Sequence, residues 1–287
     1  MMALLELFKP RIALLAALTA AVGAALTPPG PAASILPPAA AVFALAAGAC
    51  ALNQYQERRA DAAMPRTARR PIPSGRLRPA VALGAAGVAI AAGTGALAVF
   101  GGMPSAALGL LAVLWYNGLY TPLKCHSAWA AIPGALVGAV PPLIGGWAAA
   151  GGPPPPAVWA LAGFMVLWQV PHFWLLLLAH ADEYRRAGFP VLTERFQPGR
   201  LVRVTAAWTL AAAVSSLVLP LYLDPGRSWI ACLILLPAAG LSLAAVRLLP
   251  SSLDRPDGLC RRVFGTINGF AVMTLALLLL DRALVLR

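Results

Sequence analysis

Three side chains able to ligate a metal ion recur at intervals of four in the first charged stretch of the chain: Asn53, Glu57 and Asp61. On a continuing helix each interval rotates the side chain by only about 40° and advances it about 6 Å, so all three share one face. Two kinds of partner would satisfy them. Neighbouring arginines would give an ordinary ion-pair network, whereas Mg²⁺ takes oxygen ligands and commonly bridges protein carboxylates to substrate phosphates.

The residues that follow favour the metal and phosphate interpretation. Arg66, Arg69 and Arg70 come shortly after the acidic residues, and a guanidinium group binds phosphate oxygens in bidentate fashion. Asn53 and Asp61 would lie about 12 Å apart along a continuous helix, which is too far to share one octahedral ion. The sequence therefore predicts either two cations that bridge a diphosphate or a break in the helix between Asn53 and Asp61.

A second acidic pair stands at the end of a later apolar segment. Asp182 and Glu183 are flanked there by Arg185 and Arg186. Acidic side chains at the edge of an apolar segment are costly unless they have a partner, and they often mark a functional site. If both acidic segments face the same compartment, they could bind one diphosphate from two sides.

Long apolar segments carry these two clusters. Of the 287 residues, 60% are hydrophobic and 11% are charged, and most charges lie between the apolar blocks. Blocks of about 20 residues match the hydrocarbon thickness of a bilayer. We therefore expect an all-α, polytopic membrane protein with a single transmembrane domain over residues 1–287. The sequence predicts about nine transmembrane helices, near residues 12–27, 33–52, 80–100, 104–121, 128–150, 157–179, 202–223, 229–249 and 262–280.

The distribution of basic residues predicts the orientation in the membrane. With nine spans, nineteen of the 22 Lys and Arg residues fall on one side, together with the N-terminus and both acidic clusters. Cytoplasmic loops collect Lys and Arg, so this side is predicted to face the cytoplasm and the C-terminus to lie outside, with the chain in the inner (cytoplasmic) membrane. The net charge of +12 then reflects loops beside anionic lipid, and we expect no nucleic-acid partner.

Several motifs together make the sequence similar to a known family. They are Lys9-Pro10-Arg11, the stretch Asn53–Gly75, Tyr120-Thr121 with Lys124, the Gly- and Pro-rich pattern Gly138–Trp147, and His172-Phe173-Trp174. Over this region the chain resembles the UbiA-type intramembrane prenyltransferases, and within that family the members that farnesylate protohaem IX. The resemblance implies a nine-helix bundle around a central cavity, where an isoprenoid diphosphate such as farnesyl diphosphate binds with Mg²⁺ at two acidic motifs.

The same resemblance implies roles for individual residues as metal ligands, diphosphate-binding cations and substrate contacts. These are Asn53, Glu57, Asp61 and Glu183 for Mg²⁺; Arg66, Arg70 and Lys124 for the diphosphate; Asp182 as a further acid of the second motif; and Tyr120, His172 and Tyr184 for the substrates. With Lys124 and Asp182, the four metal ligands form the expected catalytic set.

Some positions depart from the family pattern and leave the acceptor open. Arg59 stands where the family usually has another aspartate, His180 where an arginine is common, and Cys125-His126-Ser127 replaces a more basic stretch. The acceptor is then the vinyl group of haem B, giving haem O, or an aromatic quinone precursor or a lipid alcohol. A transporter or a catalytically silent relative is the alternative from another class. His172 either orients haem or hydrogen-bonds a neighbouring helix.

Overall fold

The computed structural model describes residues 2–28, 35–223, 228–249 and 257–285, and this part of the chain contains helices and no strand. The all-α prediction is therefore confirmed. The first two helices, α1 (Met2–Phe8) and α2 (Pro10–Ala25), meet at a bend of 47°. Lys9 makes this bend with a left-handed backbone (φ 45°, ψ 63°). That conformation costs a non-glycine residue about 1–2 kcal/mol.

The second long helix ends inside the first acidic cluster. Helix α3 covers Leu36–Gln56 and the short helix α4 covers Arg58–Ala63. Between them Glu57 has φ −90° and ψ 3°, which interrupts the regular helix. Of the two alternatives predicted for this segment, the structure therefore contains the helix break.

Helix α5 (Pro79–Val113) folds back on itself at Gly102. The backbone of Gly102 has φ 77° and ψ 166°, a conformation that is open only to glycine. The two halves then lie side by side, because a Cβ added to Gly109 would meet the side chain of Leu97. Directly after Val113 the chain continues as a π-helix, η1 (Leu114–Tyr120), and the short helix α6 (Thr121–Leu123).

The rest of the described chain is a series of long helices joined by short ones. They are α7 (Ala131–Ala135), η2 (Leu136–Ala139), α8 (Val140–Ala150), α9 (Pro156–Ala179), α10 (Ala181–Arg186), η3 (Leu192–Glu194), α11 (Pro198–Ser215), η4 (Ser216–Tyr222), α12 (Ser228–Val246) and α13 (Asp257–Val285).

These helices agree with the predicted membrane passes. By length and hydropathy, seven helical stretches of the described residues can cross a membrane, and the bent α1–α2 pair makes eight. One of the seven, Pro79–Leu123, contains 45 residues. A straight helix of that length would be about twice as long as the hydrocarbon layer is thick, and the reversal at Gly102 divides it into two passes. The described residues thus supply about nine passes.

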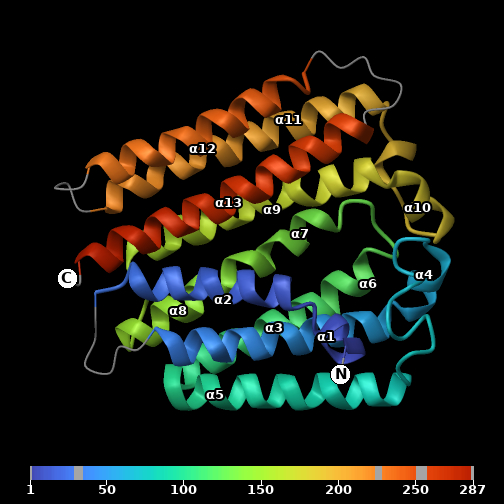
Figure 1. Ribbon diagram of the computed structural model, residues 1–287, viewed down its shortest axis with the longest axis horizontal. Helices are drawn as coiled ribbons and strands as arrows, with labels where there is room; N and C mark the ends of the chain where they lie inside the picture. The colour runs from blue at the N-terminus through green and yellow to red at the C-terminus, as the bar shows by residue number, and fades with distance from the viewer. Residues whose placement is uncertain (1, 29–34, 224–227, 250–256, 286–287) are drawn as a thin grey trace.

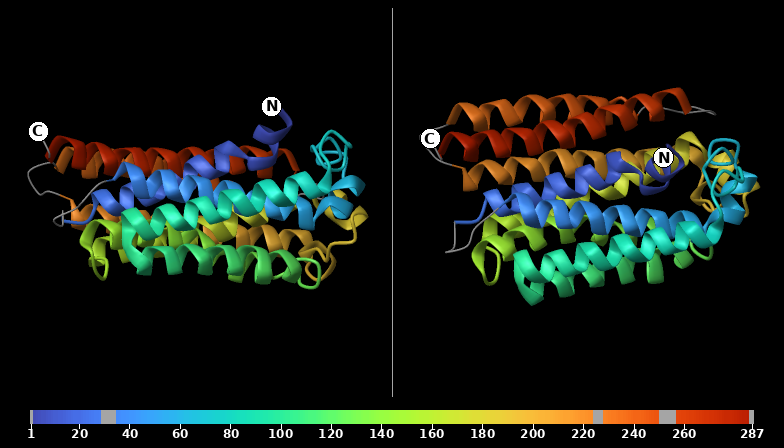
Figure 2. Two further views of the ribbon diagram at one scale, coloured as in Figure 1. Left: turned by 90° about the horizontal axis from the view of Figure 1, so that it is seen from below. Right: turned by 60° about the horizontal axis from the view of Figure 1, so that its bottom comes forward.

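The bundle has two sides with α2 between them. Figures 1 and 2 show α11, α12 and α13 on one side and α3 and α5 on the other. Helix α2 belongs to both apolar cores, since Val22 packs in the larger core and Ala20 in the smaller one. Glycines allow α8 to approach it closely: a Cβ on Gly145 would overlap the backbone of Ala20. Such small residues let helices pack tightly within lipid.

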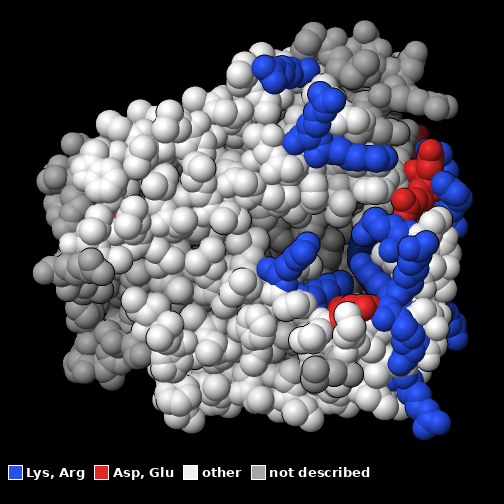
Figure 3. Space-filling model, viewed as in Figure 1, with Lys and Arg blue, Asp and Glu red and all other residues white. Residues whose placement is uncertain are grey.

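The charged segments gather at one end of this bundle. Helices α4 and α10 lie together at that end, while the last turn of α13 lies at the other (Figure 1). The space-filling view shows most of the visible Lys and Arg side chains at the end with α4 and α10 (Figure 3). The fold therefore brings the two acidic segments to the same end of the molecule.

Candidate active site

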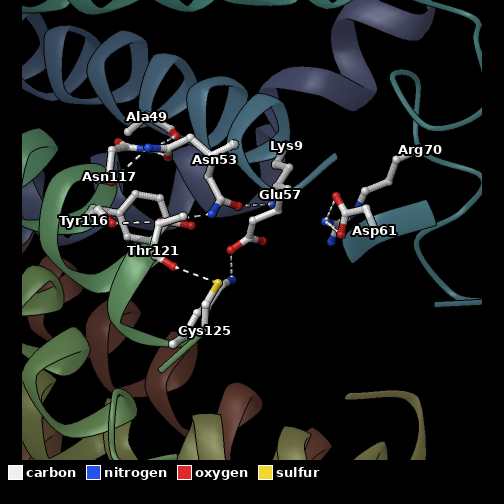
Figure 4. Close-up of polar contacts among 12 residues, drawn as sticks. Lys9, Ala49, Asn53, Glu57, Asp61, Arg70, Tyr116, Asn117, Thr121 and Cys125 are labelled. Carbon is white, nitrogen blue, oxygen red and sulfur yellow. Dashed lines mark hydrogen bonds and ion pairs between the residues drawn. The ribbon is translucent and has the colours of Figure 1, made fainter. Parts of the chain in front are cut away.

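Asn53 links three elements at the basic end of the bundle. Its buried Oδ1 accepts a hydrogen bond from Lys9 Nζ at 3.4 Å, and its Nδ2 donates to Thr121 Oγ1 at 3.1 Å (Figure 4). Thr121 in turn donates to the carbonyl of Tyr116 in the π-helix. Because both ends of the amide are held, the Asn53 oxygen keeps one position and points toward the ammonium group of Lys9.

Glu57 lies at the helix break and forms an ion pair with Lys124, which follows α6. The side chains are only 8% and 22% exposed, respectively. Burial, the largest single influence, lowers the pKa of Lys124, but attraction to the Glu57 carboxylate, the hydrogen bond to it and the nearby Tyr120 and Tyr184 together raise the pKa above the ordinary value. Lys124 therefore stays positively charged at neutral pH and is placed to bind an anion beside Glu57.

Asp61 is held by a different cation. Its carboxylate is 1% exposed, and Arg70 Nη1 donates to both oxygens at 2.7 Å. Thr67 Oγ1 also donates to the backbone carbonyl of Asp61 at 2.9 Å. Figure 4 shows the Asp61–Arg70 pair apart from Asn53 and Glu57. Asn53, Glu57 and Asp61 therefore each contact a different cation: Lys9, Lys124 and Arg70, respectively.

Glu183 connects the second acidic segment to the first. Its Oε1 lies 3.2 Å from His180 Nδ1, and its Oε2 lies 3.9 Å from Arg66 Nε. The Oε2 atom is buried and has no hydrogen-bond partner among the described residues. His180, which the sequence marked only as a departure, thus helps to position this carboxylate. Arg66, from the first acidic segment, thus places a positive charge beside the acid of the second segment.

Asp182 points away from this arrangement. Its side chain is 78% exposed and accepts a hydrogen bond from Arg185 at 2.9 Å. Arg185 also binds Glu194 on the outer surface at 3.1 Å. The structure therefore separates the two neighbouring acids of the second motif: Glu183 faces Arg66 and Asp182 faces outward.

Aromatic rings surround Lys124 on the side facing the bundle. A small cavity of about 70 Å³ is lined there by side chains that include Tyr120, Lys124, Phe173, Tyr184 and Phe189. The ammonium group of Lys124 lies 5.6 Å from the ring centre of Tyr120 and 5.7 Å from that of Phe189. Both predicted tyrosines thus contact the same cavity as Lys124, at the edge between the polar end and the apolar interior.

His172 lies deeper in the bundle than the charged residues. It is sandwiched between the rings of Trp168 and Phe264, with ring centres 4.8 Å away on each side. Its Nδ1 is buried without a hydrogen-bond partner among the described residues. Phe173 connects it to the cavity, since this ring is 5.6 Å from His172 and stacks on Tyr120 at 5.8 Å.

Sequence reasoning missed the polar residues that support the site. Asn117, inside the π-helix, donates to the Ala49 carbonyl at 3.0 Å and to Gln56 Oε1 at 3.1 Å. Gln56 returns a hydrogen bond to the Asn117 carbonyl at 2.9 Å. A buried amide within an apolar span was the available signal, because such residues need partners and π-helices often occur at functional sites.

The sequence profile of the UbiA prenyltransferase family matches residues 14–278, which is most of the chain. The chain belongs to the UbiA prenyltransferase family. A relative from Geobacter sulfurreducens, a protoheme IX farnesyltransferase, is 42% identical over 282 residues. The match covers 96% of this chain and 98% of the relative.

Solved structures share the UbiA fold. A UbiA homolog from Aeropyrum pernix K1 superposes with a TM-score of 0.78 at 20% identity, over 95% of this chain and 98% of that one. A UbiA homolog from Archaeoglobus fulgidus bound to GPP and Mg²⁺ gives a TM-score of 0.67 at 16% identity, over 96% and 99% of the two chains. At these identities the likeness establishes the shared architecture.

The acidic side chains of this UbiA-family protein fit a metal ion that is shared with a substrate. The described residues contain no group of three or more His, Cys, Asp or Glu side chains placed to hold an ion alone. Mg²⁺, however, is usually bound by one or two carboxylates together with water and substrate phosphates. The orphaned Glu183 Oε2 is such a donor, since a buried carboxylate oxygen without a partner is costly. Glu57 and Asp61 are the other carboxylates that would supply hard oxygen atoms to such an ion.

Proposed function

We propose that this protein transfers a farnesyl group from farnesyl diphosphate to a vinyl group of protohaem IX (haem B), giving haem O. The observation that carries this proposal is the 42% identity, over nearly the full length of both chains, to a protoheme IX farnesyltransferase. The gathering of both acidic segments and their cations at one end of a membrane-spanning bundle supports it, because prenyl transfer needs an anion site beside an apolar cavity.

The donor diphosphate binds at the basic end of the bundle. Arg66, Arg70 and Lys124 provide the cations, each already facing an acid: Glu183, Asp61 and Glu57, respectively. Asn53, Glu57, Asp61 and Glu183 are the candidate ligands for Mg²⁺. When bound, Mg²⁺ neutralises negative charge that grows on the leaving diphosphate. These ion pairs keep the cations in place before the substrate arrives.

The reaction begins when the bond between C1 of the farnesyl chain and the diphosphate oxygen breaks, and the electron pair leaves with the diphosphate. Arg66, Arg70 and Lys124 stabilise that charge electrostatically. The allylic cation is attacked by the vinyl carbon of the acceptor, which forms the new carbon–carbon bond. Water then adds to the neighbouring carbon and loses a proton. Tyr120, Phe173 and Phe189 provide an apolar wall that keeps other water from the cation.

We further propose that the protein lies in the cytoplasmic membrane with its N-terminus and the active site toward the cytoplasm. The support is the Lys and Arg side chains at the end that holds α4 and α10 (Figure 3), since cytoplasmic loops are rich in these residues. Substrate would then reach the charged end from the cytoplasmic leaflet.

A transfer assay with purified protein tests the proposal. Protein with Mg²⁺, farnesyl diphosphate and protohaem IX is expected to give a haem that carries a hydroxyethylfarnesyl group, detected by mass spectrometry. The variants Glu57→Gln and Asp61→Asn should lose most diphosphate release while remaining folded, and so should wild-type protein with a chelator. Folded wild-type protein that releases no farnesylated haem, but does prenylate an aromatic acid or a lipid alcohol, would overturn the assignment of the acceptor.

A further inference from the structure

A second cavity, with mostly basic charged residues in its lining, lies beside the candidate donor site. The cavity there has a volume of about 590 Å³ and opens between the α1–α2 bend and the segment that follows α4. This size falls in the range of about 300–1,000 Å³ that is typical of small-molecule sites. Figure 3 shows basic side chains around a hollow near the charged end. Five of the lining residues are basic and one is acidic: Lys9, Arg11, Arg66, Arg69, Arg70 and Glu6.

The basic residues of this cavity fall into two groups. Lys9, Arg66 and Arg70 reach the donor site, where they contact Asn53, Glu183 and Asp61. Arg11 and Arg69 are exposed, and no carboxylate pairs with either of them among the described residues. The cavity thus has an inner wall shared with the donor site and a rim with two uncompensated guanidinium groups.

The acid in the lining does not neutralise the rim. Glu6 forms a bidentate ion pair with Arg76, at 3.0 and 2.6 Å. Apolar side chains complete the rim, where Leu5 is 55% exposed and Ile12 is 56% exposed. A ligand that suits this rim therefore has two negative groups beside a large apolar body.

We propose that Arg11 and Arg69 bind the two propionate groups of the acceptor, protohaem IX. This inference rests on the proposed function and adds the acceptor site to it. The donor diphosphate already has its own cations, so the two rim arginines are free for a second dianion, and guanidinium groups bind carboxylates in bidentate fashion. In protohaem IX the vinyl groups lie on the porphyrin edge opposite the propionates. Holding the propionates at the rim therefore turns a vinyl group inward, toward the donor.

The test compares Arg11→Gln, Arg69→Gln and the double variant with wild-type protein in phosphatidylcholine nanodiscs. Protohaem IX binding without donor is followed by the Soret band, and KM is measured for protohaem IX and farnesyl diphosphate. Each substitution should weaken protohaem IX binding roughly tenfold or more, the size of one charge-assisted contact. The KM for farnesyl diphosphate should change by less than about twofold. Arg78→Gln, an exposed arginine at the same end but outside the cavity, is the matched control.

Protohaem IX dimethyl ester supplies the decisive comparison, because it lacks both negative charges. Wild-type protein should bind the ester as weakly as the double variant binds the free acid, and the double variant should no longer distinguish the two. Discrimination that survives in the double variant would overturn the proposal. So would an effect that appears only when phosphatidylglycerol is added and acts equally on both substrates, since the rim would then bind a lipid headgroup.

The same measurements separate this inference from the proposed function. Arginine-dependent protohaem IX binding without any transfer by wild-type protein would leave the rim site standing and remove the proposed reaction. If wild-type protein transfers the farnesyl group but both variants bind protohaem IX with unchanged affinity, the rim site is wrong and the proposed reaction stands. If wild-type protein neither binds protohaem IX nor transfers the farnesyl group, both the rim site and the proposed reaction are wrong.

Discussion

Arg66 Nε lies 3.9 Å from Glu183 Oε2, so a cation from the first acidic segment faces an acid from the second. The two segments are far apart in the sequence, yet this contact joins them across the mouth of the site. Glu183 Oε2 has no hydrogen-bond partner among the described residues, so in the proposed mechanism it would be available to a cation that binds together with the diphosphate.

The variants Arg66→Gln and Glu183→Gln should affect substrate binding far more than stability. The contact is partly exposed, with 36% and 21% of the two side chains accessible, so its loss should change the free energy of unfolding by less than about 1 kcal/mol. Each variant should raise the KM for farnesyl diphosphate roughly tenfold or more. Steady-state kinetics and thermal unfolding in the same detergent would measure both. A large loss of stability without a kinetic effect would contradict the assignment.

Glu57 and Lys124 should behave as a coupled pair. Glu57→Ala leaves the ammonium group of Lys124 without its carboxylate in a mostly buried place, which should destabilise the protein by roughly 3 kcal/mol. The double variant Glu57→Ala/Lys124→Met removes both charges and should recover much of that stability, while diphosphate release stays abolished. A double-mutant cycle of unfolding free energies tests this. Additive effects of the two substitutions would show that the pair is not coupled.

The stabilisation that Lys124 provides should be lost only at alkaline pH. Its pKa is raised above the ordinary 10.5, because the interactions with Glu57, Tyr120 and Tyr184 together outweigh the effect of burial. A raised pKa means that the stabilisation is complete below the unfolded value of 10.5 and declines as pH rises through the higher folded value. The difference in Tm between wild-type protein and Lys124→Met should therefore stay constant from about pH 6 to 9 and shrink above about pH 10.5. A difference that already shrinks near pH 8 would argue against this pairing.

Gly102→Ala should disturb the reversal that divides α5. At φ 77° and ψ 166° an added Cβ costs about 1–3 kcal/mol, so the variant should have a lower Tm and fold less efficiently into membranes. Gly95→Ala is the matched control in the same helix, where nothing lies within 4 Å of the new methyl group. There alanine should be neutral or stabilising by up to about 1 kcal/mol. Equal Tm values for the two variants would contradict the reversal.

The sequence alone determined the class of the protein and most of its candidate site. Apolar blocks of bilayer length predicted the helices, because backbone groups in lipid must be satisfied within each segment. The regular spacing of Asn53, Glu57 and Asp61 identified the first acidic cluster, and the arginines beside Glu183 identified the second. These patterns involve residues close together in the sequence, so they can be recognised without knowledge of how the helices pack.

Only the tertiary structure decided how those residues meet. The structure pairs Lys124 with Glu57 and Arg70 with Asp61, which periodicity could not predict because it describes one helix and not the segments that pack against it. The outward turn of Asp182, likewise, depends on how α10 packs at the end of the bundle. Pairings between distant segments are set by packing, and packing within lipid follows shape and small residues, which leave no simple pattern along the chain.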